Sequence, residues 1–368
     1  MLRKEKLEAL PLAEAPEVNA LLERLGLGTL APAETSTFAG RNNNWAGRTD
    51  NGSRVFVKRL DGDRAESILR FHRVLDLQAV LASRPDGGLR SPRLLGADEE
   101  SRLVVFEWLE DARAGNTMAA DGEFTPETAR EAGRSIGALH RLPAAADTSP
   151  HPLPPTWALQ AIPLSMFSSA RIAELRYWGL LQRDRPLADA LAELRLREER
   201  DAEHRPSHSD LRLDQFLLDG TDLYVLDWEE FRMADPARDV GAFAGEWLHH
   251  AIRKVNSETD RYYGAGTTLS HDLIVERGSA EIAAVRPLIA AFWQGYLDSG
   301  VPVDATLPER ATAFAGWHLL DRLLASAGTQ TRLRPVDLAA AGIGRTALLT
   351  PSHFTETLGL TTPHPTPA

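Results

Sequence analysis

The stretch SHSDLRLDQF, residues 207–216, places Asp210 two residues after a histidine and five residues before the amide side chain of Gln215. It continues into the apolar run 216–218, a turn at 219–220, and a second apolar run, 223–226, that ends at Asp227. Two short apolar runs joined by such a turn predict a β-hairpin. Because the strands of a hairpin begin and end at the same edge, we expect Asp210, Gln215 and Asp227 to lie close to one point.

The composition is that of a globular protein of about two lobes. The chain has 368 residues, of which 43% are hydrophobic. No apolar run is long enough to cross a membrane and the first residues are charged, so we expect a cytoplasmic protein without a membrane partner. The absence of cysteine leaves oxygen and imidazole as metal ligands, which favours Mg²⁺. The net charge of -11 disfavours nucleic acid as a partner and mildly favours a cationic or neutral substrate.

Residues 35–108 predict a small antiparallel β-sheet with one main helix. Two extended runs lie within residues 35–60, and Asp-Asn-Gly at 50–52 forms a hairpin turn into the strand 54–58. Helical spacing follows over 63–82, and two more strands flank a turn at 98–100. An amphipathic helix at 16–26 precedes this lobe, so we assign residues 1–34 to an N-terminal helical extension.

Residues 109–368 predict a larger, mostly helical lobe. Thr125 followed by Pro126 is typical of a helix start, and helical patterns follow over 171–203 and 281–330. The change of composition at 107–114 predicts the hinge between the lobes. We expect the small lobe to bind a nucleotide and the larger lobe to hold the catalytic and acceptor-binding residues.

The candidate site residues suit phosphoryl transfer. That reaction needs a group that orients the attacking hydroxyl, oxygen ligands for magnesium and a cation on the nucleotide phosphates. Asp210 suits the first task, and Gln215 and Asp227 suit the second. A lysine on the third strand, paired with a helix carboxylate, would supply the cation, and Lys58 and Glu66 lie in the expected segments. The sequence therefore predicts a phosphotransferase that uses ATP and Mg²⁺.

Two further segments are candidates for nucleotide binding. Gly40 lies between the first two strands, where it lets backbone N–H groups approach a phosphate, and Asn42 and Asn43 add amide donors. The apolar strand 103–109 leads into the hinge, where the backbone from Glu107 to Leu109 would pair with the edge of adenine.

The segments HSDLRLDQFLL and LYVLDWEEFRMADPARDVGAF resemble the catalytic loop and metal-binding segment of the aminoglycoside phosphotransferase and choline kinase superfamily. The segments FVKRL, GRSIGALHRL and AAFWQGYLDSG are also similar to that group, so the resemblance covers about residues 35–300. It implies an α+β, protein-kinase-like two-lobed fold. It also implies that Asp210 is the catalytic base, Asp227 the chief magnesium ligand and Lys58 the phosphate cation.

Two positions depart from the usual pattern of that superfamily. It has Gly where this chain has Ser209, and Asn where this chain has Gln215. Ser209 adds little bulk. Gln215 is one methylene longer than Asn, so it must retract or bind the metal through water.

A narrower resemblance concerns the acceptor. GRNNNWAG, AGWHLLDRLLASAG and GIGRTALL look like the kinase subunits of class V lanthipeptide and thioamitide biosynthesis. This resemblance implies phosphorylation of Ser or Thr in a ribosomal precursor peptide, after which a separate lyase eliminates phosphate. Two alternatives stay open: a kinase for a small hydroxylated molecule such as an aminoglycoside or a choline-like amine, and a catalytically silent pseudokinase scaffold, which Gln215 suggests.

Several other polar residues have simpler explanations than chemistry. We expect His208 to pack under the loop and bond a backbone carbonyl, and Asp235 and Asp239 to be architectural. Gly342 and Gly344 lack the lysine and spacing of a phosphate loop, so they predict a helix break.

Overall fold

Five antiparallel strands form the sheet of the small lobe, in the order β1-β2-β3-β5-β4. The computed structural model describes residues 9–38, 40–84, 87–200, 202–263 and 270–361. Within them the strands are β1 Ser36–Thr37, β2 Asn43–Arg48, β3 Arg54–Arg59, β4 Leu94–Asp98 and β5 Leu103–Glu107. Gly52, in the turn between β2 and β3, has a φ of +85°, which a glycine adopts without strain. The predicted antiparallel sheet is therefore confirmed.

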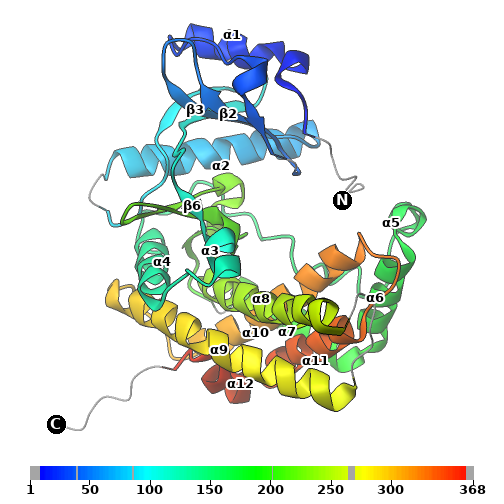
Figure 1. Ribbon diagram of the computed structural model, residues 1–368. Helices are drawn as coiled ribbons and strands as arrows, with labels where there is room; N and C mark the ends of the chain where they lie inside the picture. The colour runs from blue at the N-terminus through cyan, green and yellow to red at the C-terminus, as the bar shows by residue number, and fades with distance from the viewer. Residues whose placement is uncertain (1–8, 39, 85–86, 201, 264–269, 362–368) are drawn as a thin grey trace, which may run out of the picture.

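Two helices cover the sheet, one on each face (Figure 1). Helix α1, Pro16–Arg24, packs Val18, Leu21 and Leu22 against the buried side chains of the first face, among them Val55 and Val57 of β3. Because side chains alternate along a strand, Lys58 points to the opposite face, the side of α2, Arg64–Ala82. The side chain of Asp63 caps α2 by accepting hydrogen bonds from Ala65 and Glu66.

The second lobe is mostly helical, as expected (Figure 1). Its helices are α3 Gly115–Asp121, α4 Pro126–Leu139, α5 Leu164–Ser169, α6 Ile172–Arg183, α7 Arg185–Arg200, α8 Ala237–Tyr263, α9 His271–Asp298, α10 Leu307–Ala327, α11 Pro335–Leu349 and α12 Pro351–Leu358. The predicted start of α4 is confirmed, because Thr125 Oγ1 accepts a hydrogen bond from Thr128 N at 3.2 Å. No helix of the described residues is long and apolar enough to span a bilayer.

Short strands in this lobe carry the segments expected to be functional. They are β6 Arg113–Ala114, β7 Arg205–Ser207, β8 Phe216–Asp219, β9 Asp222–Val225 and β10 Arg232–Ala234, with short 3₁₀ turns η3 at Leu213–Gln215 and η4 at Trp228–Glu230. Strands β8 and β9 form the predicted hairpin, with Phe216 opposite Val225. Just beyond that pair, the carbonyl of Gln215 accepts a hydrogen bond from Leu226 N at 2.9 Å. The hairpin therefore brings Gln215 next to Asp227.

The predicted helix break at residues 342–345 is wrong, because both glycines lie inside α11. A Cβ atom on Gly344 would lie 2.9 Å from the carbonyl oxygen of Gly316 in α10, and one on Gly316 would lie 2.5 Å from that of Gly344. The two helices thus cross with their backbones in close approach. Glycine is needed there for helix packing, and it does not end the helix.

Candidate active site

A buried aspartate on α8 holds the catalytic loop. The two carboxylate oxygens of Asp239 accept hydrogen bonds from His208 N at 2.7 Å and Ser209 N at 2.8 Å, and Nε2 of His140 lies 3.0 Å from Oδ2. Ser209 has a φ of +69°, a left-handed conformation that favours glycine. The architectural role predicted for Asp239 is confirmed, and this geometry explains why glycine is usual at position 209.

His208 packs under the catalytic loop and contacts a backbone carbonyl, as predicted. Its Nε2 lies 2.7 Å from the carbonyl oxygen of Leu226, and its ring packs on Trp228 with the ring centroids 4.8 Å apart. Since Leu226 precedes Asp227, this contact joins the loop that carries Asp210 to the segment that carries Asp227.

The carboxyl of Asp210 lies in an environment that suits a base. Burial raises its pKa above the ordinary value, the charge of Asp227 adds to the rise, and Arg212 opposes it. A carboxylate with a raised pKa accepts a proton more readily than a free one, provided that it is still ionised at the working pH.

Lys58 bridges the two lobes. Its Nζ contacts Oδ1 of Asp227 and lies 2.5 Å from Oε2 of Glu229. These two carboxylates outweigh the effect of burial and raise the pKa of Lys58, and the lysine holds the pKa of Asp227 well below its usual range in spite of burial. Asp227 has a φ of +70°, so its backbone is strained at the point where its carboxylate meets the lysine.

The expected partner of Lys58 is not its partner in the structure. Glu66 is 57% exposed and pairs with Arg70, one turn along α2. The same helix instead directs Arg70 and Arg73 toward Glu230, at 3.1 Å each. The sequence predicts that α2 supplies a carboxylate to Lys58. In the structure α2 supplies arginines, and the segment after Asp227 supplies the carboxylates. Glu66 therefore lies outside the candidate site.

The loop before β2 reaches across to the larger lobe. The side chain of Asn42 donates a hydrogen bond to Oε2 of Glu229 at 2.6 Å, and Arg41 pairs with the other oxygen of that carboxylate. Gly40 is exposed at the start of this loop. The side chains of residues 41 and 42 thus lie where phosphates would approach Lys58.

The structure does not bring Asn43 to the site. Its cross-strand partner is Arg59, on the far side of the sheet from Lys58, and its amide donates to Asp61 at 2.6 Å. Asn44 is the cross-strand partner of Lys58 and shares its face. Because side chains alternate along β2, Asn44 and not Asn43 lies on the same face of the sheet as Lys58.

Gln215 is at the expected place but is turned away from a ligand role. Its Oε1 accepts a hydrogen bond from Arg212 N at 2.9 Å, and its Nε2 is buried without a partner among the described residues. Within those residues no three His, Asp or Glu side chains are grouped as a metal site. Asp227 and Glu229 still supply hard oxygen ligands, and Mg²⁺ commonly binds through one or two carboxylates plus phosphate oxygens and water. The donor set fits magnesium in that manner.

Some backbone groups of the hinge already form hydrogen bonds within the protein. Glu107 N donates to the carbonyl of Arg93 at 3.0 Å, and the Glu107 side chain accepts from Arg93 N at 2.8 Å. The carbonyl of Leu109 accepts from Ala112 N at 3.2 Å, which closes a turn at the start of the larger lobe. Glu107 is the last residue of β5 and Leu109 follows it at the passage into the larger lobe, and their place beside adenine stays a prediction.

The sequence-based prediction missed two charged residues. Glu229 lies two residues after Asp227, and the repeated acidic residues of DWEE were the available signal. Arg212 lies two residues after Asp210, with its Nη2 3.9 Å from Oδ2 of Asp227. Asp210, Asp214, Asp227 and Glu246 together outweigh burial and raise the pKa of Arg212. Arg212 is therefore a permanent cation beside Asp227, and its charge also acts on Asp210.

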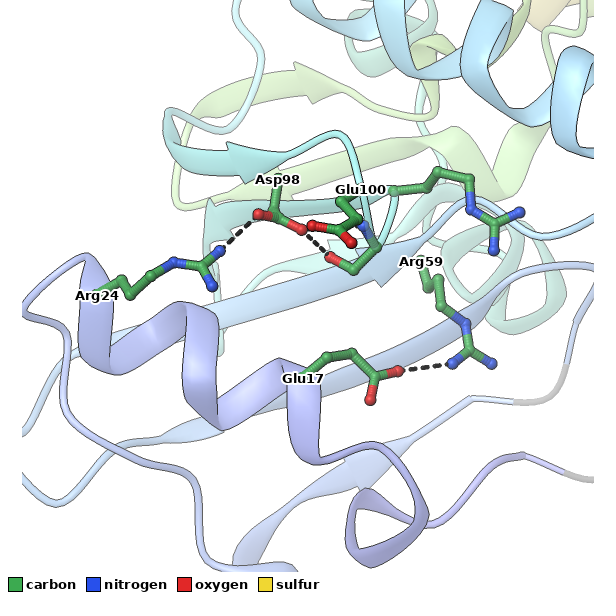
Figure 2. Close-up of a pocket in the computed structure, with 7 residues that line it drawn as sticks. Glu17, Arg24, Arg59, Asp98 and Glu100 are labelled. Atoms are coloured by element: carbon green, nitrogen blue, oxygen red, sulfur yellow. Dashed lines mark hydrogen bonds and ion pairs between the residues drawn. The ribbon is translucent and has the colours of Figure 1, made fainter.

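A cavity of about 400 Å³ lies between α1 and the sheet (Figure 2). Its charges pair with each other: Arg24 with Asp98 at 2.5 Å, and Arg59 with Glu17 at 2.9 Å. Arg59 is next to Lys58 on β3, so the two side chains point to opposite faces of the sheet. This cavity is therefore separate from the candidate active site.

The two lobes and the carboxylates around Lys58 and Asp210 define a kinase-like phosphotransferase. A model of the phosphotransferase enzyme family matches residues 36–273, which is more than half of the sequence. The chain belongs to this family, and it is an ATP-dependent phosphotransferase that acts on a hydroxyl group. The predicted resemblance to the aminoglycoside phosphotransferase superfamily is confirmed. No curated protein sequence matches the chain.

Solved structures of distant relatives share the fold. Ethanolamine kinase from Plasmodium vivax has a TM-score of 0.53 and 12% identity, covering 98% of this chain and 93% of that chain. Spectinomycin phosphotransferase, solved with ADP and spectinomycin, has a TM-score of 0.51 and 14% identity, covering 93% of this chain and 98% of that chain. An amicoumacin kinase, solved in complex with AMP-PNP, Ca²⁺ and Ami, has a TM-score of 0.51 and 11% identity, covering 92% of this chain and 96% of that chain. At these identities the likeness shows the fold alone.

Proposed function

We propose that the protein transfers the γ-phosphate of ATP to a Ser or Thr hydroxyl of a ribosomal precursor peptide, and that a separate lyase then eliminates the phosphate. The observation that carries the phosphotransfer is the bridge from Lys58 to Asp227, with Asp210 on the adjoining loop. The peptide acceptor is supported by the narrower resemblance and by one feature of the surface.

That feature is a series of exposed apolar side chains within residues 157–172 of the helical lobe, here called the exposed apolar patch: Trp157, Leu164, Phe167 and Ile172. Each of these side chains is more than half exposed, and Leu164 is 80% exposed. Leu164 and Phe167 belong to α5, which lies at the upper right edge of the helical lobe in Figure 1, and Ile172 is the first residue of α6. Apolar groups gathered in this way mark a binding surface more often than chance exposure does. A peptide is long enough to contact such a patch and the catalytic loop together.

Each residue of the site has its own role in the phosphoryl transfer. Asp210 accepts the proton of the acceptor hydroxyl as its oxygen forms a bond to the γ-phosphorus, and the bond from that phosphorus to the β-phosphate oxygen breaks to release ADP. Lys58 and the 40–42 loop would hold the phosphates, and Arg212 would face the charge of the transferred group. The backbone from Glu107 to Leu109 would hold adenine. Magnesium, held by Asp227 with Glu229, would neutralise charge on the phosphates when bound.

Mass spectrometry after incubation with ATP, Mg²⁺ and Ser- and Thr-containing peptides tests the proposal. We expect a gain of about 80 Da per phosphoryl group on a peptide. Asp210→Asn should lower the rate about 10²-fold or more, because it removes a positioned base. Asp189→Asn is the matched control, because Asp189 is an exposed residue on α7 that pairs with Arg185.

Three other outcomes contradict parts of the proposal. Phosphorylation of aminoglycosides or amino alcohols, but of no peptide, would establish a small-molecule kinase. Binding of peptide without turnover of any acceptor would establish a scaffold, in keeping with the orientation of Gln215. Full activity in Asp210→Asn would remove Asp210 from its role.

A further inference from the structure

A buried carboxylate connects the catalytic loop to α10. Oε2 of Glu246, on α8, accepts a hydrogen bond from Leu213 N at 3.3 Å. The other oxygen lies 2.8 Å from Nε2 of His318 and 3.2 Å from Nε of Arg322. These charges outweigh burial and lower the pKa of Glu246 to about 2. A single carboxylate therefore spans the gap between the catalytic loop and two basic side chains of the helical lobe.

Arg322 has unused binding capacity at this position. Glu246 is the only carboxylate among the described residues that forms an ion pair with it; Nε lies 3.2 Å from that carboxylate but donates no hydrogen bond to it. Within the same part of the chain, neither terminal nitrogen of its guanidinium donates a hydrogen bond, and its side chain is 29% exposed. A guanidinium presents its terminal nitrogens to a carboxylate as a planar fork, which makes arginine well suited to bind one more anion.

The basic residues lie on a partly exposed stripe of α10 made by His318, Arg322 and Ala325, which recur at helical spacing. The stripe leads toward α6, because a Cβ atom on Gly328 would lie 3.6 Å from Oε2 of Glu174. Gly328 is about 9 Å along the helix axis from Arg322. Helix α6 begins at Ile172, a member of the exposed apolar patch. The stripe thus runs between the catalytic loop and that patch.

We propose that Arg322, with His318 beside it, binds a carboxylate of the acceptor, so that the preferred acceptor is an acidic peptide. This inference rests on the proposed function and specifies its substrate. The carboxylate and the target Ser or Thr would belong to one extended segment, in which each residue advances about 3.3 Å. The chain's overall charge of -11 favours cations only at long range. Within a Debye length of about 8 Å the nearest charged groups decide instead.

A peptide library tests this inference. Peptides with one Ser or Thr carry Glu, Gln or Lys at each of the three positions on either side, and kcat/KM is measured for each. We expect Glu at one position to exceed Gln there by about tenfold or more, because a hydrogen-bonded charge pair is lost. Arg322→Gln should bring this ratio close to one, and Arg322→Glu should favour Lys at the same position. Arg134→Gln, which alters an exposed arginine paired with Glu131 on α4, should keep the ratio.

Equal rates for Glu and Gln peptides, or a full ratio in Arg322→Gln, would overturn the inference while leaving the peptide kinase intact. Melting temperatures of the variants check their folding. If Arg322→Glu does not fold, the neutral Arg322→Gln decides. If no peptide is phosphorylated, the proposed function fails, and the same comparison is made with small hydroxy acids and amino alcohols. A preference for amino alcohols would then overturn the anion site as well.

Discussion

Nζ of Lys58 lies 2.5 Å from Oε2 of Glu229, so a small-lobe cation and a large-lobe carboxylate are joined where nucleotide phosphates would bind. The same carboxylate holds Asn42 and Arg41 of the loop before β2. Glu229 is therefore bonded to the same side chains that are expected to bind phosphate. Nucleotide binding has to separate these contacts or to insert a cation among them.

Lys58→Met should lower both activity and stability. The lysine is largely buried, and its removal leaves Asp227 and Glu229 close together without their shared cation. Breaking a buried pair in this way costs about 3 kcal/mol in the free energy of unfolding, and loss of a phosphate-binding cation costs about 10²-fold in kcat/KM. Urea unfolding and steady-state kinetics measure the two effects. Lys58→Arg keeps the charge and is the control. A Met variant as stable as the wild type would contradict the bridging role.

Two glutamates near α2 should respond differently to loss of charge. Glu66→Gln removes a largely exposed carboxylate and leaves Arg70 paired with Glu230, so we expect a change of less than about 1 kcal/mol and a kcat/KM within about twofold of wild type. Glu230→Gln leaves Arg70, Arg73 and Arg232 without their common partner, and should cost about 3 kcal/mol. Thermal and urea unfolding compare the two. A kcat/KM lowered far beyond twofold in Glu66→Gln would restore its predicted role beside Lys58.

Arg212→Leu should shift the acid limb of the pH profile of kcat/KM. Asp210 must be ionised to accept a proton, and Arg212 lowers the pKa of Asp210. Without the arginine that pKa rises, so activity is lost at a higher pH as the solution is acidified. Arg212→Lys keeps the positive charge and should show a smaller shift. An unchanged acid limb in Arg212→Leu would mean that the two groups do not interact.

The hairpin and the lysine strand could be predicted from sequence because they depend on short-range patterns. The turn at 219–220 and the flanking apolar runs determine that Gln215 and Asp227 lie together. The alternation along β3 likewise determines that Lys58 faces away from α1. Such features follow from a period of two residues and from turn chemistry.

The choice of ion-pair partners could not be predicted in the same way. Whether Lys58 meets Glu66 or Glu229 depends on the rotation of α2 and on how the lobes are placed, and both glutamates occur in plausible segments. The error over α11 has a related cause, because Gly344 is required by the approach of Gly316 from another helix. Contacts between distant segments decide both cases.

His249 should make the protein less stable in mild acid. Burial, with the charges of Arg322, His318 and Arg253, lowers the pKa of His249 to about 4, although Glu246 opposes the change. The unfolded chain has a His pKa near 6.5, so it binds the proton first as the pH falls from about 6.5 to 4. The stability contributed by neutral His249 is complete above that interval and is lost through it. Between pH 7 and pH 5 the loss is about 2 kcal/mol.

Urea unfolding of His249→Gln at pH 7 and pH 5 isolates this contribution. The variant has no group that titrates at this position, so we expect it to lose about 2 kcal/mol less than the wild type over that interval. Other acid-sensitive groups are common to both proteins and cancel in the comparison. His72→Gln is the control, because His72 is about half exposed and near Glu99, and it should lose as much as the wild type. Parallel losses in the wild type and His249→Gln would show that His249 accepts a proton in the folded protein as easily as in the unfolded chain.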